Sequence, residues 1–589
     1  MNKQNAIHAG DSAGIILTPC PKGYSLDQDK AFAPEETLAK VKSRLASLPF
    51  SILAETRRID NGRLGIPVYL SVCSAEAKRH MPTRKQMGKG ANPAQAEASA
   101  LMELMERYGF FTFWANLPDA RQTTWSEAEA LFGDRLMPLE EIIKACHDHI
   151  SVQAARRIMD LRSWLFFPVL RIADNKTFFA PLDLFRQLGE FNGSSAGNSD
   201  AESILQGACE LVERHVCCIA DREKLVLPTI SLSPESMGDT TLVELVERFL
   251  QAGVQILLKD LSLGMPVPTV AALAWDPATF PERSEIVFTA GSASGAAKAA
   301  IRALTEVAQL GGDFNSNSCY EASGLPKFTA LAEAEWLFRG PERELREMPR
   351  LESDDILNEL LALSRALLAE GHNLYSVSTK NAATSVPTHY SFVPGFCFHE
   401  RDANASLGLF VGRLISEEAD PVSAVKAFAL LEEIYPASHF LPFFKGMLAL
   451  REQDFQTAKT LFSKAVPVQP DADSSALAAF YLAYAYSLED DWQAALPHFD
   501  TAATLCPDMK EYLNFRGVCL FRLGRYEEAA RDFADILKRL DKGSATDLQN
   551  LGLCYKRLGK IAEPRQYLEA ALFAEPHLEK ALQELQELG

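Results

Sequence analysis

The chain is poor in cysteine, and its basic residues are outnumbered by acidic ones. Eleven cysteines are spread over 589 residues, and none of them forms a C-x-x-C pair. This excludes a zinc ribbon and a thioredoxin-like redox motif, and it favours reduced, mainly buried thiols. Lys and Arg number 59 against 78 Asp and Glu, which gives a net charge of −19. That balance argues against direct nucleic-acid or membrane-surface binding, although a local basic pocket for phosphate remains compatible.

Long apolar runs are also missing. No stretch reaches the roughly 20 residues that a membrane-spanning helix needs. Near the N-terminus only residues 14–17 form an apolar stretch, which is too short for the core of a signal peptide. We therefore expect a cytoplasmic protein. Hydrophobic residues make up 47% and charged residues 23%, as in ordinary soluble globular proteins.

The C-terminal third contains internal repeats at a helix-turn-helix spacing of ~34 residues. Four copies are clear and one is degenerate, and small and aromatic residues mark them: Ala424 and Phe428 (degenerate), Gly446 and Phe462, Ala483 and Phe499, Gly517 and Phe533, and Gly552 and Ala571. Small residues let paired helices approach, while aromatic residues fill the space between repeats. The segment 577–589 is expected to form a solvated cap helix.

This pattern resembles the tetratricopeptide repeat over residues 405–589. The resemblance implies an all-α solenoid whose concave face holds a peptide or protein partner. Two alternatives stay open. The array could form a homodimer, or it could pack against the N-terminal part as a scaffold.

Residues 1–400 mix strand-like and helical patterns. Residues 65–72, 164–170 and 254–259 are short β-type runs, and longer segments of helical period lie between them. This alternation predicts an α+β or α/β domain.

The first informative helix begins at Asn92, whose side chain is a good N-cap, with Pro93 in the first helical position. Ser99, Glu103 and Glu106 follow at i, i+4 and i+7 and therefore share one face. Their neighbours are apolar, so we expect this polar stripe to face inward.

Two further helices repeat the arrangement after Gly-rich loops. The stripe of the first consists of Glu202, Gln206, Glu210 and Glu213, and that of the second of Arg302, Glu306 and Gln309. Ser199 with Glu202 matches a capping box. A Gly-rich loop before a helix also offers N–H groups to phosphate.

Any one stripe is most simply a solvated helix face, but three such stripes indicate a common site. Facing carboxylates repel one another unless cations lie between them, and Mg²⁺ prefers such oxygen ligands. Arg107, Arg214 and Arg302 are suited to phosphate oxygens. The residues thus predict a Mg²⁺–nucleotide pocket, and the chain has no Walker-type loop.

The segments 88–108, 191–215 and 302–309 resemble the three signature stretches of the YcaO superfamily, and the similarity extends over residues 25–400. The resemblance implies an α+β, ATP-binding domain that acts on peptide backbone amides. In that family a thiol, a hydroxyl or sulfide adds to an amide carbonyl. ATP then phosphorylates the oxyanion, and loss of phosphate yields an azoline, thioamide or amidine.

The same resemblance implies the site residues. Those expected at the ATP site are Lys30, Thr37, Ser99, Asn198, Glu202, Arg214, Arg302 and Glu306. Those expected to bind Mg²⁺ are Glu103, Glu106, Glu210 and Glu213. No catalytic base is implied by the motifs.

Two departures from the family pattern bear on the activity. The loop 291–295 lacks the histidine and proline often found there, and the chain does not end in the proline-rich tail of many azoline-forming members. Members with a helical C-terminal extension are commonly accessory factors for ribosomal-protein methylthiolation, which is the leading interpretation. The alternatives are a thioamide- or azoline-forming enzyme of natural-product maturation, and a non-catalytic scaffold that recruits partners through its repeats.

Overall fold

The computed structural model describes residues 13–117, 120–315, 320, 325–399, 404–538 and 543–588. Residues 1–12 and Gly589 lie outside the described residues. The first range includes part of the N-terminal stretch discussed above as a signal peptide, and Gly589 is the last residue of the expected cap helix. Two compact units are distinguished, one of Met1–Val152 with Ser163–Ala403 and the other of Gln153–Arg162 with Asn404–Gly589. Within the described residues, no helix is long and apolar enough to cross a membrane.

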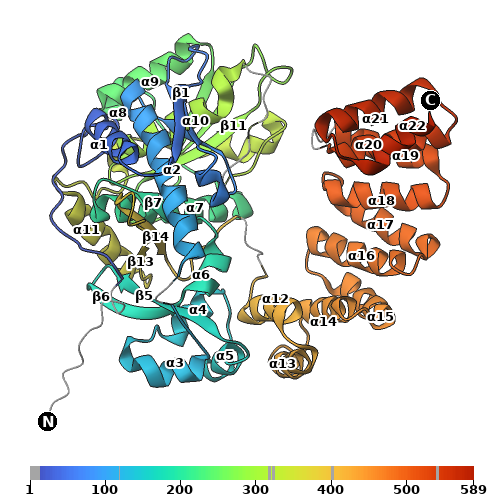
Figure 1. The fold of residues 1–589 in the computed structure, drawn as a ribbon. Helices are drawn as coiled ribbons and strands as arrows, with labels where there is room; N and C mark the ends of the chain where they lie inside the picture. Colours follow the sequence, from blue (N-terminus) through green and yellow to red (C-terminus); the bar gives the residue numbers. More distant parts are fainter. Residues whose placement is uncertain are drawn as a thin grey trace. The chain divides into compact units, whose positions relative to one another are not determined.

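Three sheets form the framework of the first unit (Figure 1). The smallest is antiparallel, in the order β1 (Leu53–Arg58), β2 (Val68–Cys73) and β3 (Lys85–Lys89). The second has the order β11 (Val287–Ser292), β10 (Thr269–Trp275), β9 (Gln255–Asp260), β8 (Thr229–Ile230) and β12 (Glu342–Arg343). The third has the order β4 (Arg121–Thr123), β5 (Trp164–Arg171), β13 (Tyr375–Ser378), β14 (Thr388–Phe392) and β7 (Ser194–Ala196), and β6 (Lys176–Pro181) pairs with β5.

The three strand-like runs of the sequence are confirmed as β2, β5 and β9. Strand β2 begins only at Val68, after Pro67, which has no N–H to donate to a ladder. The α+β class is confirmed as well, because all strand pairs are antiparallel except β8 with β12.

Three helices cover the sheets and carry the predicted stripes. They are α2 (Pro93–Ala115), α7 (Asp200–Glu223) and α10 (Ala296–Gly311). Helix α2 packs on β2, β3 and β7, α7 on β7, β11 and β14, and α10 on β3, β10 and β11. Each helix therefore bridges two sheets, and Figure 1 shows α2 crossing in front of α7. The other helices of this unit are α1 (Pro34–Ala46), α3 (Trp125–Phe132), α4 (Leu139–Ala145), α6 (Leu182–Gly189), α8 (Pro234–Met237), α9 (Thr240–Gln251) and α11 (Ile356–Ala369). Helix α5 (Val152–Met159) belongs to the second unit except for Val152.

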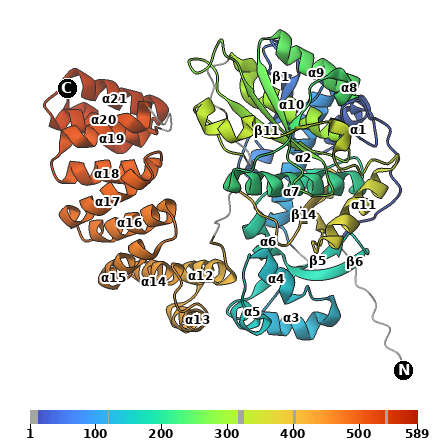
Figure 2. The ribbon, with the colours of Figure 1, turned by 180° about the vertical axis from the view of Figure 1, so that it is seen from behind.

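The repeats fold as successive antiparallel helix pairs (Figure 2). The helices are α12 (Leu407–Glu418), α13 (Pro421–Ile434), α14 (Phe440–Arg451), α15 (Phe455–Ala465), α16 (Ala472–Ser487), α17 (Trp492–Leu505), α18 (Lys510–Arg522), α19 (Tyr526–Lys538), α20 (Ala545–Arg557), α21 (Ala562–Ala574) and α22 (Glu579–Glu587).

Glycine and phenylalanine make the helix crossings of the repeats. A Cβ on Gly446 would lie 2.8 Å from the ring of Phe462, and one on Gly517 would lie 2.9 Å from the ring of Phe533. Both rings are almost completely buried. The packing inferred from the repeat spacing is therefore observed, and α22 forms at the expected cap.

Candidate functional site

A glycine stands at a close approach before each of the three motif helices. A Cβ on Gly88 would lie 2.0 Å from the backbone of α2, one on Gly197 would lie 2.5 Å from that of α7, and one on Gly291 would lie 2.4 Å from that of α10. No side chain fits at such distances, so glycine holds each strand or loop against its helix. This close approach explains the Gly-rich entries and brings the polar stripes toward one another.

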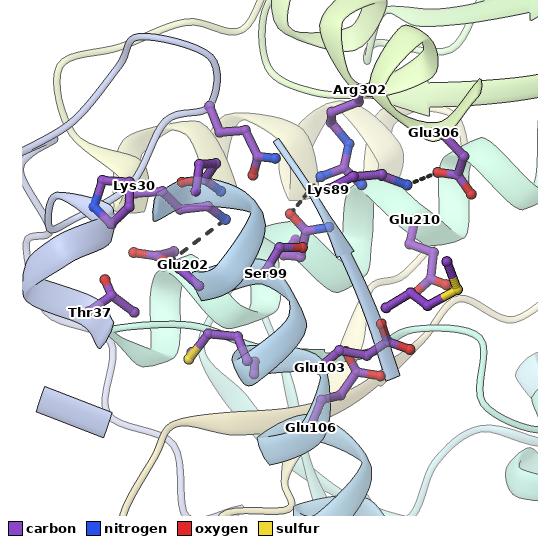
Figure 3. A pocket seen from close by; sticks show the side chains of 18 of the residues that line it. Lys30, Thr37, Lys89, Ser99, Glu103, Glu106, Glu202, Glu210, Arg302 and Glu306 are labelled. Carbon is purple, nitrogen blue, oxygen red and sulfur yellow. Dashed lines mark hydrogen bonds and ion pairs between the residues drawn. The ribbon is translucent and has the colours of Figure 1, made fainter. Parts of the chain in front are cut away.

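The stripes converge on one cavity of about 330 Å³ (Figure 3). All twelve predicted site residues line it: Lys30, Thr37, Ser99, Glu103, Glu106, Asn198, Glu202, Glu210, Glu213, Arg214, Arg302 and Glu306. The stripe on α2 thus faces inward, as its apolar neighbours indicated. The assignment of individual residues to ATP or Mg²⁺ stays a prediction.

Glu202 organises one end of the cavity. Its carboxylate accepts hydrogen bonds from the backbone N–H of Ala31 at 2.8 Å and from Asn198 Nδ2 at 3.1 Å. Lys30 Nζ lies 3.9 Å from Glu202 Oε1, and Thr37 Oγ1 donates to Asn198 Oδ1 at 3.1 Å. The N-terminal loop is therefore joined to α7 directly through the buried Glu202 carboxylate, and α1 is joined to it through Asn198.

The expected capping box at the start of α7 is only half formed. Ser199 Oγ accepts from the backbone N–H of Glu202 at 3.1 Å, as predicted. The Glu202 carboxylate does not return to the Ser199 N–H, because it is engaged by Ala31 and Asn198 instead. The sequence pattern thus predicted the start of α7 correctly, but its prediction that Glu202 caps the Ser199 N–H is wrong.

Acidic residues gather at the other end of the cavity (Figure 3). Arg107 Nη1 lies 3.3 Å from Glu106 Oε1, and Arg107 Nη2 lies 3.9 Å from Glu103 Oε1. Glu210 Oε1 lies 3.8 Å from Arg214 Nη2. Arg107 and Arg214 thus pair with three glutamates, and each of these N···O distances is longer than the distance of a good charge-assisted hydrogen bond.

Burial raises the pKa of these acids. Burial, followed by the charges of Glu210 and Glu103, raises the pKa of Glu106 to about 8 against the attraction of Arg107. The pKa of Glu103 is raised by burial and by the charges of Glu306 and Glu210, and that of Glu213 is raised by burial and by the Glu306 charge. A bound cation would offset this mutual repulsion.

The middle of the cavity is bridged by interactions that the motifs did not reveal. Lys89 of β3 pairs with Glu306 of α10, and it lowers the pKa of Glu306 although burial acts in the opposite direction. Arg302 Nη1 donates to Gln206 Oε1 at 3.0 Å. Lys89 was missed because nothing in the local sequence links a strand residue to a helix 217 positions away.

The cavity fits a nucleotide with Mg²⁺. The Nε atoms of Arg214 and Arg302 are buried and find no hydrogen-bond partner among the residues with described positions, so phosphate oxygens would satisfy them. Among the described residues, no group of three or more His, Cys, Asp or Glu side chains is placed to enclose a metal. Mg²⁺ is usually held by one or two carboxylates together with water and phosphate, and which of the four predicted glutamates bind it stays a prediction.

The sequence model of a family described as a YcaO cyclodehydratase that binds ATP and Mg²⁺ matches residues 87–397. The chain belongs to the YcaO family. Tetratricopeptide repeat models match residues 445–509 and 489–545. Both resemblances drawn from the motifs are therefore confirmed, and ATP and Mg²⁺ are the ligands of the matched family.

Curated relatives and solved structures are similar to parts of this chain. The ribosomal protein S12 methylthiotransferase accessory factor YcaO of Escherichia coli is 30% identical over 220 residues, which are 32% of this chain and 35% of that protein. An uncharacterized protein of Methanothermobacter thermautotrophicus is 29% identical over 289 residues, which are 48% of this chain and 70% of that protein. A heterocyclase solved with substrate and cofactor is 21% identical with a TM-score of 0.53, covering 65% of this chain and 54% of that one. The likeness to the heterocyclase supports the fold alone.

Proposed function

We propose that this YcaO-family protein uses ATP and Mg²⁺ to activate a backbone amide of a peptide or protein. The observation that carries the proposal is the convergence of three polar stripes on one cavity, where burial of Glu106 outweighs the charge of Arg107 beside it. Arg214 and Arg302 would orient phosphate oxygens, and Glu103, Glu106, Glu210 and Glu213 would hold Mg²⁺. Bound ATP would supply the phosphoryl group that makes an amide oxygen a good leaving group.

Glu106 and Lys89 would also set the protonation and the charge of the cavity. With a pKa of about 8, Glu106 retains its proton near neutral pH until a cation displaces it. Lys89 keeps Glu306 ionised beside Arg302, which fixes the charge at the centre of the cavity.

Nucleotide binding is the direct test. Calorimetry with a non-hydrolysable ATP analogue and Mg²⁺ should show binding by the wild type and a loss of at least about tenfold in Glu103→Ala and Glu210→Ala. Glu247→Ala, at an exposed position on α9, is the matched control and should bind normally. Failure of the wild type to bind, or unchanged binding by both cavity variants, would refute the proposal.

We infer that the biological role is that of an accessory factor in ribosomal-protein methylthiolation, acting in the cytoplasm. The similarity to the Escherichia coli factor supports this role, and the described cysteines form no disulfide, which is compatible with a reducing compartment. The alternative of natural-product maturation would instead yield a thioamide or azoline detectable by mass in a dedicated peptide.

The repeats would recruit the protein partner. An acidic chain attracts a basic ribosomal protein, and repeat arrays present extended binding surfaces. Binding to purified ribosomal protein S12 should weaken steeply between 50 and 300 mM salt, both set as assay conditions. Salt-insensitive binding would contradict this partner, and a self-association of the repeats would appear as a dimer in sedimentation.

A further inference from the structure

A second cavity lies one helical turn beyond the acidic end of the first. Phe110 and Trp114 of α2 follow Glu106 at i+4 and i+8 and therefore lie on the same side of the helix. They line a groove of about 600 Å³ together with Leu117, Leu165, Asp183, Arg186, Gln187, Glu190 and Phe191. This volume is within the range of ligand pockets, ~300–1,000 Å³.

One tight loop serves both cavities. In it, Glu190 and Gly193 have φ of 49° and 82°, and a Cβ on Gly193 would lie 2.2 Å from a backbone oxygen. Phe191 of this loop lines the groove, whereas the Gly193 N–H donates to Glu210 of the nucleotide cavity at 3.3 Å. The same short loop thus contributes to the groove through Phe191 and contacts the acidic cluster through Gly193.

Phe191 lines the groove and lies against Arg107, which lines the nucleotide cavity. Its ring packs 5.5 Å from that of Phe110, yet 40% of the residue remains exposed. The guanidinium of Arg107 lies 5.3 Å from the Phe191 ring, and the same arginine pairs with Glu106. A ligand packed on Phe191 would therefore sit next to the charges of the nucleotide cavity.

The groove also offers polar groups without partners. Arg186 stacks on the Trp114 ring at 4.7 Å and forms no ion pair within the described residues. Trp114 Nε1 is buried and has no hydrogen-bond partner in the part of the chain that the structure describes. Aromatic rings beside a free cation and a free donor suit a ligand with an apolar side chain and carbonyl oxygens, which is the chemistry of a peptide.

We propose that this groove is the acceptor subsite, where a peptide lays an aromatic or large aliphatic side chain against Phe191 and Trp114 beside the amide to be activated. The inference rests on the proposed function, because it takes the neighbouring cavity as the nucleotide site. Arg186 would hold a main-chain carbonyl of the same peptide.

Capped pentapeptides, acetyl-Gly-Gly-X-Gly-Gly-amide with X as Phe or Ala, are the probes. They are titrated into the full-length protein with Mg²⁺ and the ATP analogue and followed by ligand-observed NMR. The wild type should bind the Phe peptide about tenfold more tightly than the Ala peptide, since burial of a phenyl ring exceeds ~1.4 kcal/mol. Phe191→Ala should abolish this preference. Phe338→Ala, a similarly exposed phenylalanine outside the groove, should keep it.

Arg186→Gln separates recognition of the main chain from recognition of the side chain. It should weaken both peptides several-fold and leave the Phe-to-Ala ratio unchanged. Absence of the preference in the wild type, or its survival in Phe191→Ala, would overturn the proposal while nucleotide binding stays intact. Equal losses of nucleotide and peptide affinity in Phe191→Ala would instead assign the groove to the nucleotide. A wild type that binds no nucleotide would refute the proposed function itself.

Discussion

The two units of the chain use charged side chains in opposite ways. In the YcaO domain, the helices α2, α7 and α10 turn glutamates and arginines into a cavity, where burial raises the pKa of Glu106 and Glu103. In the repeats, the helix crossings are filled by glycine, alanine and phenylalanine, and a buried acid such as Asp532 is closely paired with Arg516 at 2.6 Å. The first arrangement gives up stability for binding chemistry, whereas the second provides a stable scaffold.

The largest effect should separate these two arrangements cleanly. Phe533→Ala removes a ring that is 1% exposed and packs on Gly517, so it should destabilise the repeats by ~3–5 kcal/mol. Hydrogen exchange should rise in α18 to α20 and not in α2, and nucleotide affinity should be unchanged. Loss of nucleotide binding in this variant would mean that the two units are energetically coupled.

Glu106→Gln should have opposite effects on stability and binding. Because burial raises the pKa of Glu106 to about 8, the unfolded chain ionises this acid at a lower pH than the folded domain does, and the nucleotide-free domain loses stability as the pH rises through about 8. At pH 9 the neutral amide should therefore stabilise the nucleotide-free domain by ~1–3 kcal/mol, while Mg²⁺–nucleotide affinity falls at least about tenfold. Urea unfolding and calorimetry on the same sample measure both. A destabilised variant would show that the carboxylate is already well compensated.

Buried histidines should give the YcaO domain a pH dependence of the other sign. Burial lowers the pKa of His389 to about 3, while a histidine of the unfolded chain titrates near ~6.5. Between these two pKa values the unfolded chain binds a proton at His389 and the folded domain does not. The free energy of unfolding therefore falls as the pH drops from about 6.5, by up to ~1.4 kcal/mol per pH unit.

The histidine contribution is best measured as a difference. Protonation of Glu106 raises the free energy of unfolding as the pH drops from about 8. In the wild type it therefore offsets part of the stability that His389 costs as the pH falls. His389→Leu should remove the histidine contribution and leave that of Glu106. The free energy of unfolding is measured by urea unfolding at several pH values. If it changes with pH equally in the wild type and in His389→Leu between pH 6.5 and 5, the prediction is wrong.

The sequence predicted the parts of this comparison that depend on local periodicity. The start of α2 was predicted at Asn92 and Pro93 and is observed there, because N-capping is a local interaction. The inward direction of its stripe followed from apolar neighbours on the same helix. The pairing of Lys89 with Glu306 was not predictable, since it depends on how β3 and α10 meet across two sheets.

The groove beside the nucleotide cavity was missed for a different physical reason. Phe110 and Trp114 read as ordinary core residues of an apolar helix, and Phe110 is indeed almost fully buried. Only the fold shows that an exposed Phe191 and Arg186, which stacks on Trp114, extend this aromatic cluster to the surface. Periodicity reveals which side of a helix is buried, but not where that side opens into a cavity.

The smallest predicted effect compares two serine caps. Ser199 accepts from the N–H of Glu202 at the start of α7, and Ser544 accepts from that of Asp547 at the start of α20. Serine to alanine should cost ~1 kcal/mol in each unit, because one helical N–H loses its partner. Only Ser199→Ala should also weaken nucleotide binding, by a few-fold, because the freed turn carries Glu202, which ties Lys30 and Asn198 to the cavity. Thermal unfolding with and without nucleotide measures both effects, and an equal loss of affinity in Ser544→Ala would show that the caps act through general stability rather than through the site.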